Sequence, residues 1–218
     1  MRRTRVSSDG RELAELVAAL PGGRCLLGIA GAPGAGKSTL AAALALRYGA
    51  TVVPMDGFHL ADVELARRGL LDRKGAPETF DAEGYAALLA RVRARPDHVV
   101  LAPAFERDLE QPVAGAIPVE PGAGLVVTEG NYLLLDEPRW HGVRAQLDQV
   151  WHVTTDEPTR VERLVARHVE FGKTPDAASS WVARVDQPNA ELVAAAAAAA
   201  DEVLDVTDWS GVLSPPGP

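Results

Sequence analysis

Residues 31–38 carry a lysine and a serine at a spacing that suits phosphate binding. They read GAPGAGKS and fit G-x-x-x-x-G-K-[S/T] at every fixed position. Glycines let successive backbone N–H groups point at phosphate oxygens, and a helix beginning here adds the positive end of its dipole. An ordinary glycine-rich turn is the alternative, but an apolar run precedes the pattern and a strong helix-forming segment follows it. We therefore predict a P-loop that binds ATP with Mg²⁺.

Each position of this loop has an expected role. Lys37 reaches the β- and γ-phosphates, the Ser38 hydroxyl coordinates Mg²⁺, and Thr39 can contact the α-phosphate. The predicted nucleotide-binding residues are Gly31, Ala32, Pro33, Gly34, Ala35, Gly36, Lys37, Ser38 and Thr39.

Two acidic residues directly follow apolar runs. Asp56 follows residues 51–55, and Glu129 follows residues 125–128. The carboxyl ends of parallel strands form the ligand crevice of α/β proteins. Asp56 can accept a proton from an attacking hydroxyl or hold Mg²⁺, and Glu129 resembles the Walker-B acid that orients Mg²⁺ or its waters. The alternative for Asp56 is that it caps a helix or a turn. The alternative for Glu129 is a purely structural role. We expect Ser38, Glu129 and Asp56 to hold the metal.

Three arginines, Arg160, Arg163 and Arg167, are spaced three and four residues apart and therefore share one helix face. A solvated basic face is the usual explanation. In a P-loop protein, arginines after the fifth predicted strand favour a lid that closes on the triphosphate and stabilises transition-state charge. We select Arg163 and Arg167, with Lys37 and Asp56, as catalytic candidates.

Lysine is rare in this chain and occurs only as Lys37, Lys74 and Lys173. An ammonium group and a guanidinium group are not interchangeable at a tight phosphate site. Lysines kept in an arginine-favouring chain can mark places where arginine does not fit, although chance explains Lys74 and Lys173 equally well.

The elements that must position these residues follow from periodicity. Apolar runs predict strands at residues 24–30, 51–55, 98–102, 125–128, 149–153 and 202–206. Helical patterns cover residues 12–20, 38–47, 83–95, 157–171 and 189–200, with Asp81 and Asp156 as N-caps. This alternation predicts a mostly parallel sheet with helices on both faces. Residues 60–79 lack clear periodicity and are interpreted as an insertion over a cleft.

Composition narrows the class of protein. The chain has 218 residues, 47% hydrophobic and 24% charged, which suits one α/β domain over residues 1–218. A net charge of −8 argues against a general nucleic-acid binder. One cysteine, no signal-peptide pattern and no long apolar run lead us to expect a cytoplasmic protein without a membrane partner, monomeric or homodimeric. His98, His141 and His152 show no metal-ligand spacing and are expected to be structural.

Five segments together resemble the phosphoribulokinase/uridine kinase family: GAPGAGKST, MDGFH, RKGAPETFD, PAFERD and VTEGNYLLL. Within it the chain looks closest to bacterial pantothenate kinase relatives, fructose transport system kinases and nucleoside kinases, over residues 26–189. The resemblance implies a three-layer α/β/α sandwich of the P-loop NTPase type, similar to the nucleoside monophosphate kinases, with an acceptor-side insertion at about 57–80 and a lid at about 157–187. It implies transfer of phosphoryl from ATP to a hydroxyl of a small molecule.

The resemblance also implies residue roles. Asp56 matches the catalytic base, Arg163 and Arg167 match the lid, and Asn189 matches a stretch near the adenine. The residues that it places near the acceptor substrate are Asp56, His59, Arg73, Lys74, Glu78, Phe105, Arg107, Asp108 and Glu129. His59 stands where uridine kinases carry tyrosine, so nucleoside, sugar and pantothenate-like acceptors all stay open, as does an already phosphorylated one. The alternative function is an NTP-hydrolysing P-loop regulator or chaperone without an acceptor, although the chain has neither an N-K-x-D nor an S-G-G-Q motif.

Overall fold

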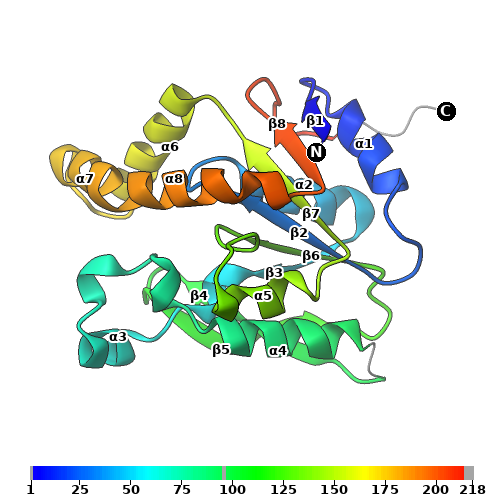
Figure 1. Ribbon diagram of the computed structural model, residues 1–218, viewed down its shortest axis with the longest axis horizontal. Coiled ribbons are helices and arrows are strands. Elements are labelled where there is room, and N and C mark those ends of the chain that lie inside the picture. The colour runs from blue at the N-terminus through cyan, green and yellow to red at the C-terminus, as the bar shows by residue number, and fades with distance from the viewer. Residues whose placement is uncertain (1, 95–96, 214–218) are drawn as a thin grey trace.

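A computed structural model describes residues 2–94 and 97–213. Its main sheet has six parallel strands in the order β1-β8-β7-β2-β6-β3 (Figure 1). The strands are β1 (Arg2–Arg5), β2 (Cys25–Gly31), β3 (Thr51–Pro54), β6 (Leu125–Gly130), β7 (Gln149–Thr154) and β8 (Glu202–Asp205). β2 is buried along its whole length, as its unbroken apolar run predicts.

Helices cover both faces of this sheet, which makes three layers. One face carries α1 (Arg11–Ala18) and α2 (Lys37–Tyr48), which share a core with Ile29 and Trp151. The other face carries α4 (Ala82–Arg93), α5 (Pro138–Arg144) and α8 (Gln187–Ala195), which pack around Leu26 and Val126. The mostly parallel α/β/α architecture of a P-loop fold is therefore confirmed.

Further segments lie beyond the carboxyl ends of the strands and form two groups, at the lower left and the upper left of Figure 1. On one side are the 3₁₀ turn η1 (Met55–Phe58), α3 (Asp62–Arg68) and the turns η2 (Leu71–Arg73) and η3 (Pro77–Thr79). On the other are α6 (Glu157–Glu170), α7 (Pro175–Trp181) and the π-helical turn η4 (Val182–Asp186). A short turn, η5 (Ala196–Ala199), ends α8.

Two predicted helix starts are confirmed by their caps. The Asp81 carboxylate accepts a hydrogen bond from the Gly84 N–H at 2.9 Å, and Asp156 accepts one from the Thr159 N–H at 3.0 Å. The last predicted helix begins two residues earlier than expected and, from Ala196 onwards, continues as a 3₁₀ turn. Within the described residues, no helix has the length and apolar character needed to cross a bilayer.

The strand expected at residues 98–102 does not join the main sheet. It forms β4 (Val100–Glu106), which pairs antiparallel with β5 (Gln111–Val119) in a separate two-stranded sheet. Only alternate residues at its start are buried, whereas Leu101 is 53% exposed. A strand with one covered face suits a hairpin rather than the middle of a parallel sheet. β5 was not predicted because Pro112, Gly115 and Pro118 interrupt its pattern, which an edge strand tolerates.

Candidate active site

The glycine loop joins β2 to α2 and presents Lys37 and Ser38 at the carboxyl edge of the sheet. Lys37 is buried, and its Nζ donates to the Ala32 carbonyl at 3.1 Å and to Asn131 Oδ1 at 2.8 Å. Ser38 Oγ donates to Glu129 Oε1 at 3.1 Å. Burial lowers the pKa of Lys37 and raises the pKa of Glu129. A cation and a carboxylate with little access to water thus face the position of the phosphates.

Glycine follows both Asp56 and Glu129 and lets the backbone pack closely beside each of them. A Cβ on Gly57 would lie 2.4 Å from the Pro103 carbonyl oxygen, and one on Gly130 would lie 2.4 Å from Met55 Cβ. Only glycine lets η1 and the end of β6 pack this closely. The nearby Asp56 charge raises the pKa of Glu129 further. At both positions the backbone therefore comes closer than a side chain would allow.

Two cavities open from this edge and meet at shared residues. The larger, of about 410 Å³, lies between η1, the β4–β5 hairpin, α6 and η4. The smaller, of about 370 Å³, lies between the glycine loop, α6 and the segment after β8, where Trp209, Ser210 and Gly211 line it. Lys37, Ser38 and Arg167 line both cavities. The junction therefore combines a lysine, a hydroxyl and an arginine, which are groups that bind phosphate oxygens and Mg²⁺.

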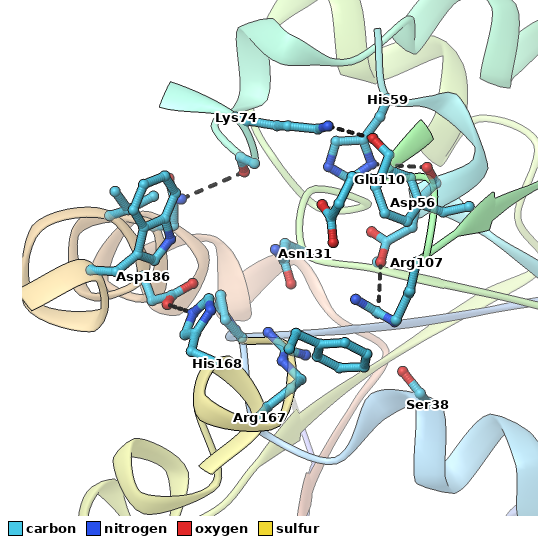
Figure 2. Close-up of a pocket in the computed structure, with 18 of the residues that line it drawn as sticks. Ser38, Asp56, His59, Lys74, Arg107, Glu110, Asn131, Arg167, His168 and Asp186 are labelled. Carbon is cyan, nitrogen blue, oxygen red and sulfur yellow. Dashed lines mark hydrogen bonds and ion pairs between the residues drawn. The ribbon is translucent and has the colours of Figure 1, made fainter. Parts of the chain in front are cut away.

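Six predicted acceptor-side residues line the larger cavity: Asp56, His59, Lys74, Phe105, Arg107 and Glu129 (Figure 2). Arg107 Nη2 lies 3.7 Å from Asp56 Oδ2, and its guanidinium lies over the Phe171 ring at 5.5 Å. Lys74 Nζ donates to Asp62 Oδ1 at 2.7 Å and to the Glu110 carbonyl at 2.5 Å. All three lysines of the chain line this cavity.

His59 is held as a neutral ring with a defined tautomer. Its Nδ1 lies 2.8 Å from the Asp56 carbonyl oxygen, which can only accept, so Nδ1 carries the proton and Nε2 is an acceptor. The ring lies between Phe80 and Phe105, with centroid distances of 4.1 and 4.8 Å. Burial lowers the pKa of His59. His59 can therefore accept a hydrogen bond from a group in the cavity.

Four predicted contacts lie elsewhere, among them Asp108, which lines neither cavity. Arg73 and Glu78 form an ion pair of 2.7 Å with each other, and neither lines the larger cavity. Lys74, the next residue along the chain, points inward instead. Asn189 was predicted to contact the base, but it lines the larger cavity and donates to the Gly75 carbonyl at 3.5 Å. The α8 start that carries Asn189 packs beside the acceptor-side loop and not beside the smaller cavity, so the geometry does not support a base contact.

The three arginines predicted to share one face of α6 lie in different surroundings. Arg160 is 3% exposed and donates to the Pro33 carbonyl at 3.3 Å, to Glu157 and to Gln187. Arg163 lines only the smaller cavity, and Arg167 lies at the junction of the two cavities. Arg160 thus joins α6 to the glycine loop, whereas Arg163 and Arg167 line the cavities.

Several lining residues were missed from the sequence. They are Leu71, Phe80, Glu110, Asn131, His168, Phe171, Trp181 and Asp186. Asn131 had a usable signal, because it lies two residues after Glu129 at the same strand end. His168 and Phe171 belong to the predicted helix at residues 157–171, close to Arg167. The others come from turns, a hairpin and a short helix whose packing no periodic pattern indicates.

The residues present fit a magnesium ion bound together with phosphates. The described part of the chain holds no cluster of three or more His, Cys, Asp or Glu side chains that could cage a metal alone. Mg²⁺ in kinase sites needs only one or two carboxylates, with phosphates and water completing its shell. Glu129 and Ser38, already in contact at 3.1 Å, supply such a donor set.

Comparisons with known proteins give a consistent result. A protein of Schizosaccharomyces pombe, provisionally named uridine kinase C227.14, is 36% identical over 160 residues, which cover 68% of each chain. The ATP-dependent kinase-like protein notR′ of Aspergillus versicolor is 36% identical over 133 residues, or 58% of this chain and 77% of that protein. A crystal structure from Silicibacter sp. TM1040, described provisionally as a fructose transport system kinase, is 39% identical with a TM-score of 0.73, covering 88% of this chain and 95% of that one. No protein-family profile matches the chain.

Proposed function

This chain belongs to the uridine kinase-like P-loop kinases, which bind ATP and act on small metabolites, and from that premise we propose that it transfers the γ-phosphoryl group of ATP to a hydroxyl group of a nucleoside, a sugar or a pantothenate-like molecule. The observation that carries the proposal is the junction of two cavities at Lys37, Ser38 and Arg167. ATP occupies the smaller cavity and the glycine loop, and the acceptor occupies the larger cavity.

Asp56 is the general base in this proposal. It accepts the proton of the acceptor hydroxyl, whose oxygen forms a bond to the γ-phosphorus. The bond from that phosphorus to the β–γ bridging oxygen breaks, and ADP leaves. Arg107, 3.7 Å from the carboxylate, holds Asp56 at the cavity wall until the hydroxyl arrives. The acceptor's other groups face His59, Lys74 and Phe105.

The phosphates are bound by Lys37, the loop N–H groups and the lid arginines. Mg²⁺ would be held by Ser38 and Glu129, with Asp56 directly or through water, and would neutralise charge on the phosphate oxygens. Arg167 at the junction stabilises negative charge in the transition state, and Arg163 contacts the nucleotide. Closure of α6 over the phosphates excludes water, which would otherwise accept the phosphoryl group.

The test is ADP release with ATP and Mg²⁺, with and without uridine, cytidine, D-ribose, D-fructose, D-glycerate or pantothenate. We expect ADP release that depends on an acceptor and that falls by about 10²-fold or more in Lys37→Ala. Arg91→Ala, on the exposed face of α4, is the control and should match wild type. Release that is independent of every acceptor would instead favour a P-loop regulator.

A further inference from the structure

The wall of the larger cavity opposite Asp56 is built by a single π-helical turn. α7 continues into η4 (Val182–Asp186), which leads directly into α8 with Pro188 in its first turn. A proline has no N–H and clashes with the carbonyl four residues before it, and a wider turn accommodates both effects. Single π turns often occur at functional sites. Here the turn places Asp186 and Asn189 on the cavity wall.

These two side chains are buried although they are polar. Asp186 is 8% exposed and Asn189 is 9% exposed. Asp186 Oδ2 accepts from His168 Nε2 at 2.9 Å, a hydrogen bond that joins α6 to η4 (Figure 2). Asn189 Nδ2 makes one long contact of 3.5 Å with the Gly75 carbonyl. Buried polar groups are costly unless their hydrogen bonds are satisfied.

Their hydrogen-bonding capacity is only partly used. Over residues 2–94 and 97–213, the structure shows no hydrogen bond to Asp186 Oδ1 or to Asn189 Oδ1. Both side chains line the cavity, three residues apart and so on one side of the helix. Acceptor atoms without a partner on a cavity wall are suited to a ligand that donates hydrogen bonds.

We propose that Asp186, positioned by His168, and Asn189 form a specificity subsite that binds a hydrogen-bond-donating group of the acceptor, at the end remote from the phosphorylated hydroxyl. The donor is a hydroxyl, an amide or an amino group, so the substrate is a neutral polyol or nucleoside rather than a carboxylic acid. This inference rests on the proposed acceptor cavity. With Asp56 and His59 Nε2 at the other end, hydrogen-bond acceptors lie at both ends of the cavity.

Charge at the subsite disfavours an anion. A carboxylate or phosphate placed here meets the buried Asp186 charge, and like charges repel strongly where water is excluded. Two of the lysines that line the cavity already have partners. Lys173 lies over the Trp181 ring at 4.7 Å, and Lys74 is bound to Asp62 and to the Glu110 carbonyl.

The test compares wild type with Asp186→Asn, which keeps the side-chain size and removes the charge. Calorimetric titration in the presence of ADP uses uridine and D-fructose as neutral probes, and D-glycerate and pantothenate as carboxylate probes. We expect wild type to bind a neutral probe and Asp186→Asn to bind it about tenfold more weakly, because a charge-assisted hydrogen bond is lost. ATP affinity should stay within twofold, and binding of the carboxylate probes relative to the neutral probe should increase.

Two further variants separate recognition from folding. Asp176→Asn removes an exposed carboxylate from α7 and should leave the affinity for every probe unchanged. Asn189→Ser shortens the second group and should weaken the neutral probe alone. Thermal unfolding of each variant confirms that it folds.

The outcomes distinguish this inference from the kinase assignment. Wild type that binds only carboxylate probes, or none, overturns the subsite, and so does equal binding of the neutral probe by Asp186→Asn. If the carboxylate probes also drive ADP release, the kinase assignment stands without the subsite. Neutral-probe binding that weakens in Asp186→Asn, without ADP release from any acceptor, upholds the subsite and refutes the kinase.

Discussion

At the scale of single residues, the site depends on charged groups held where water is scarce. Glu129 lies at the end of a fully covered strand and contacts Ser38, and Lys37 is held between the Ala32 carbonyl and Asn131. Burial disfavours the charged form of each, as the raised pKa of Glu129 and the lowered pKa of Lys37 reflect. Phosphate beside Lys37 and Mg²⁺ beside Glu129 would each add an opposite charge, so ligand binding would favour the ionised forms of both side chains.

Asp56→Asn tests the general base. An amide cannot take up the hydroxyl proton, so we expect turnover to fall by about 10²–10⁴-fold while ATP binding is retained. Acceptor-dependent ADP release measures the first effect, and titration with ADP measures the second. Asp136→Asn, at a carboxylate that is 99% exposed, is the control. Turnover in Asp56→Asn at the wild-type rate would remove Asp56 as the base.

At the scale of elements, α6 is joined to its neighbours near both ends, by Arg160 near its N-terminus and by the His168–Asp186 contact near its C-terminus. Its buried Arg160 joins the helix to the glycine loop through the Pro33 carbonyl and to α8 through Gln187. Its C-terminal half carries Arg167 and His168 to the larger cavity. In the proposed function, α6 is the lid and the glycine loop binds the phosphates. The bond from Arg160 to Pro33 makes these two segments move together.

Arg160→Met tests this attachment. The substitution leaves the Pro33 carbonyl and Gln187 without their donor, so we expect a loss of about 2–3 kcal/mol in the free energy of unfolding. The KM for ATP should rise more than the KM for the acceptor, because the lost bond is to the glycine loop. Urea unfolding and steady-state kinetics measure the two effects. Arg91→Met, on the surface of α4, should change neither; an unchanged KM for ATP in Arg160→Met would contradict the attachment.

At the scale of the whole molecule, the parallel sheet brings the site together and also buries a titratable group in its centre. His152 lies in β7 opposite Ala30 and Val203, with 3% of its surface exposed. Burial lowers the pKa of His152 to about 4 from an ordinary value of 6.5, and the nearby Lys37 charge adds to this shift. The folded protein therefore favours the neutral ring.

Acid should destabilise the fold through His152. The contribution of the neutral His152 ring to stability is complete above pH 6.5. As the pH falls from 6.5 towards 4, the unfolded chain binds the proton before the folded protein does, and this contribution is lost. The loss is at most about 3 kcal/mol. Urea unfolding at pH 7.5 and 4.5 measures it. His152→Leu removes two ring nitrogens that have no hydrogen-bond partner in the described structure, so it should be at least as stable as wild type at pH 7.5 and show a smaller decrease over this interval; an equal decrease would assign the acid sensitivity to other groups.

Much of this was available from local sequence. The glycine loop, Asp56 and Glu129 follow apolar runs directly, so a strand end and a chemical group are specified within the same few residues. The caps at Asp81 and Asp156 are equally local. Such features were predicted because neighbours in the chain are neighbours in space.

What only the tertiary structure decided is how distant segments meet at the acceptor cavity. Local sequence could not separate Arg160, which ties α6 to the glycine loop, from Arg167, which faces both cavities, because the difference lies in what each side chain packs against. Nor could local sequence predict that Asp186 and Asn189 line the larger cavity. A π turn shifts the helical register by one residue, and the hydrophobic periodicity of the sequence does not show it. The sequence by itself determined the phosphate-binding half of this protein through local backbone chemistry. The acceptor half depends on contacts between residues far apart in the chain, and those exist only once the sheet and its flanking segments have packed.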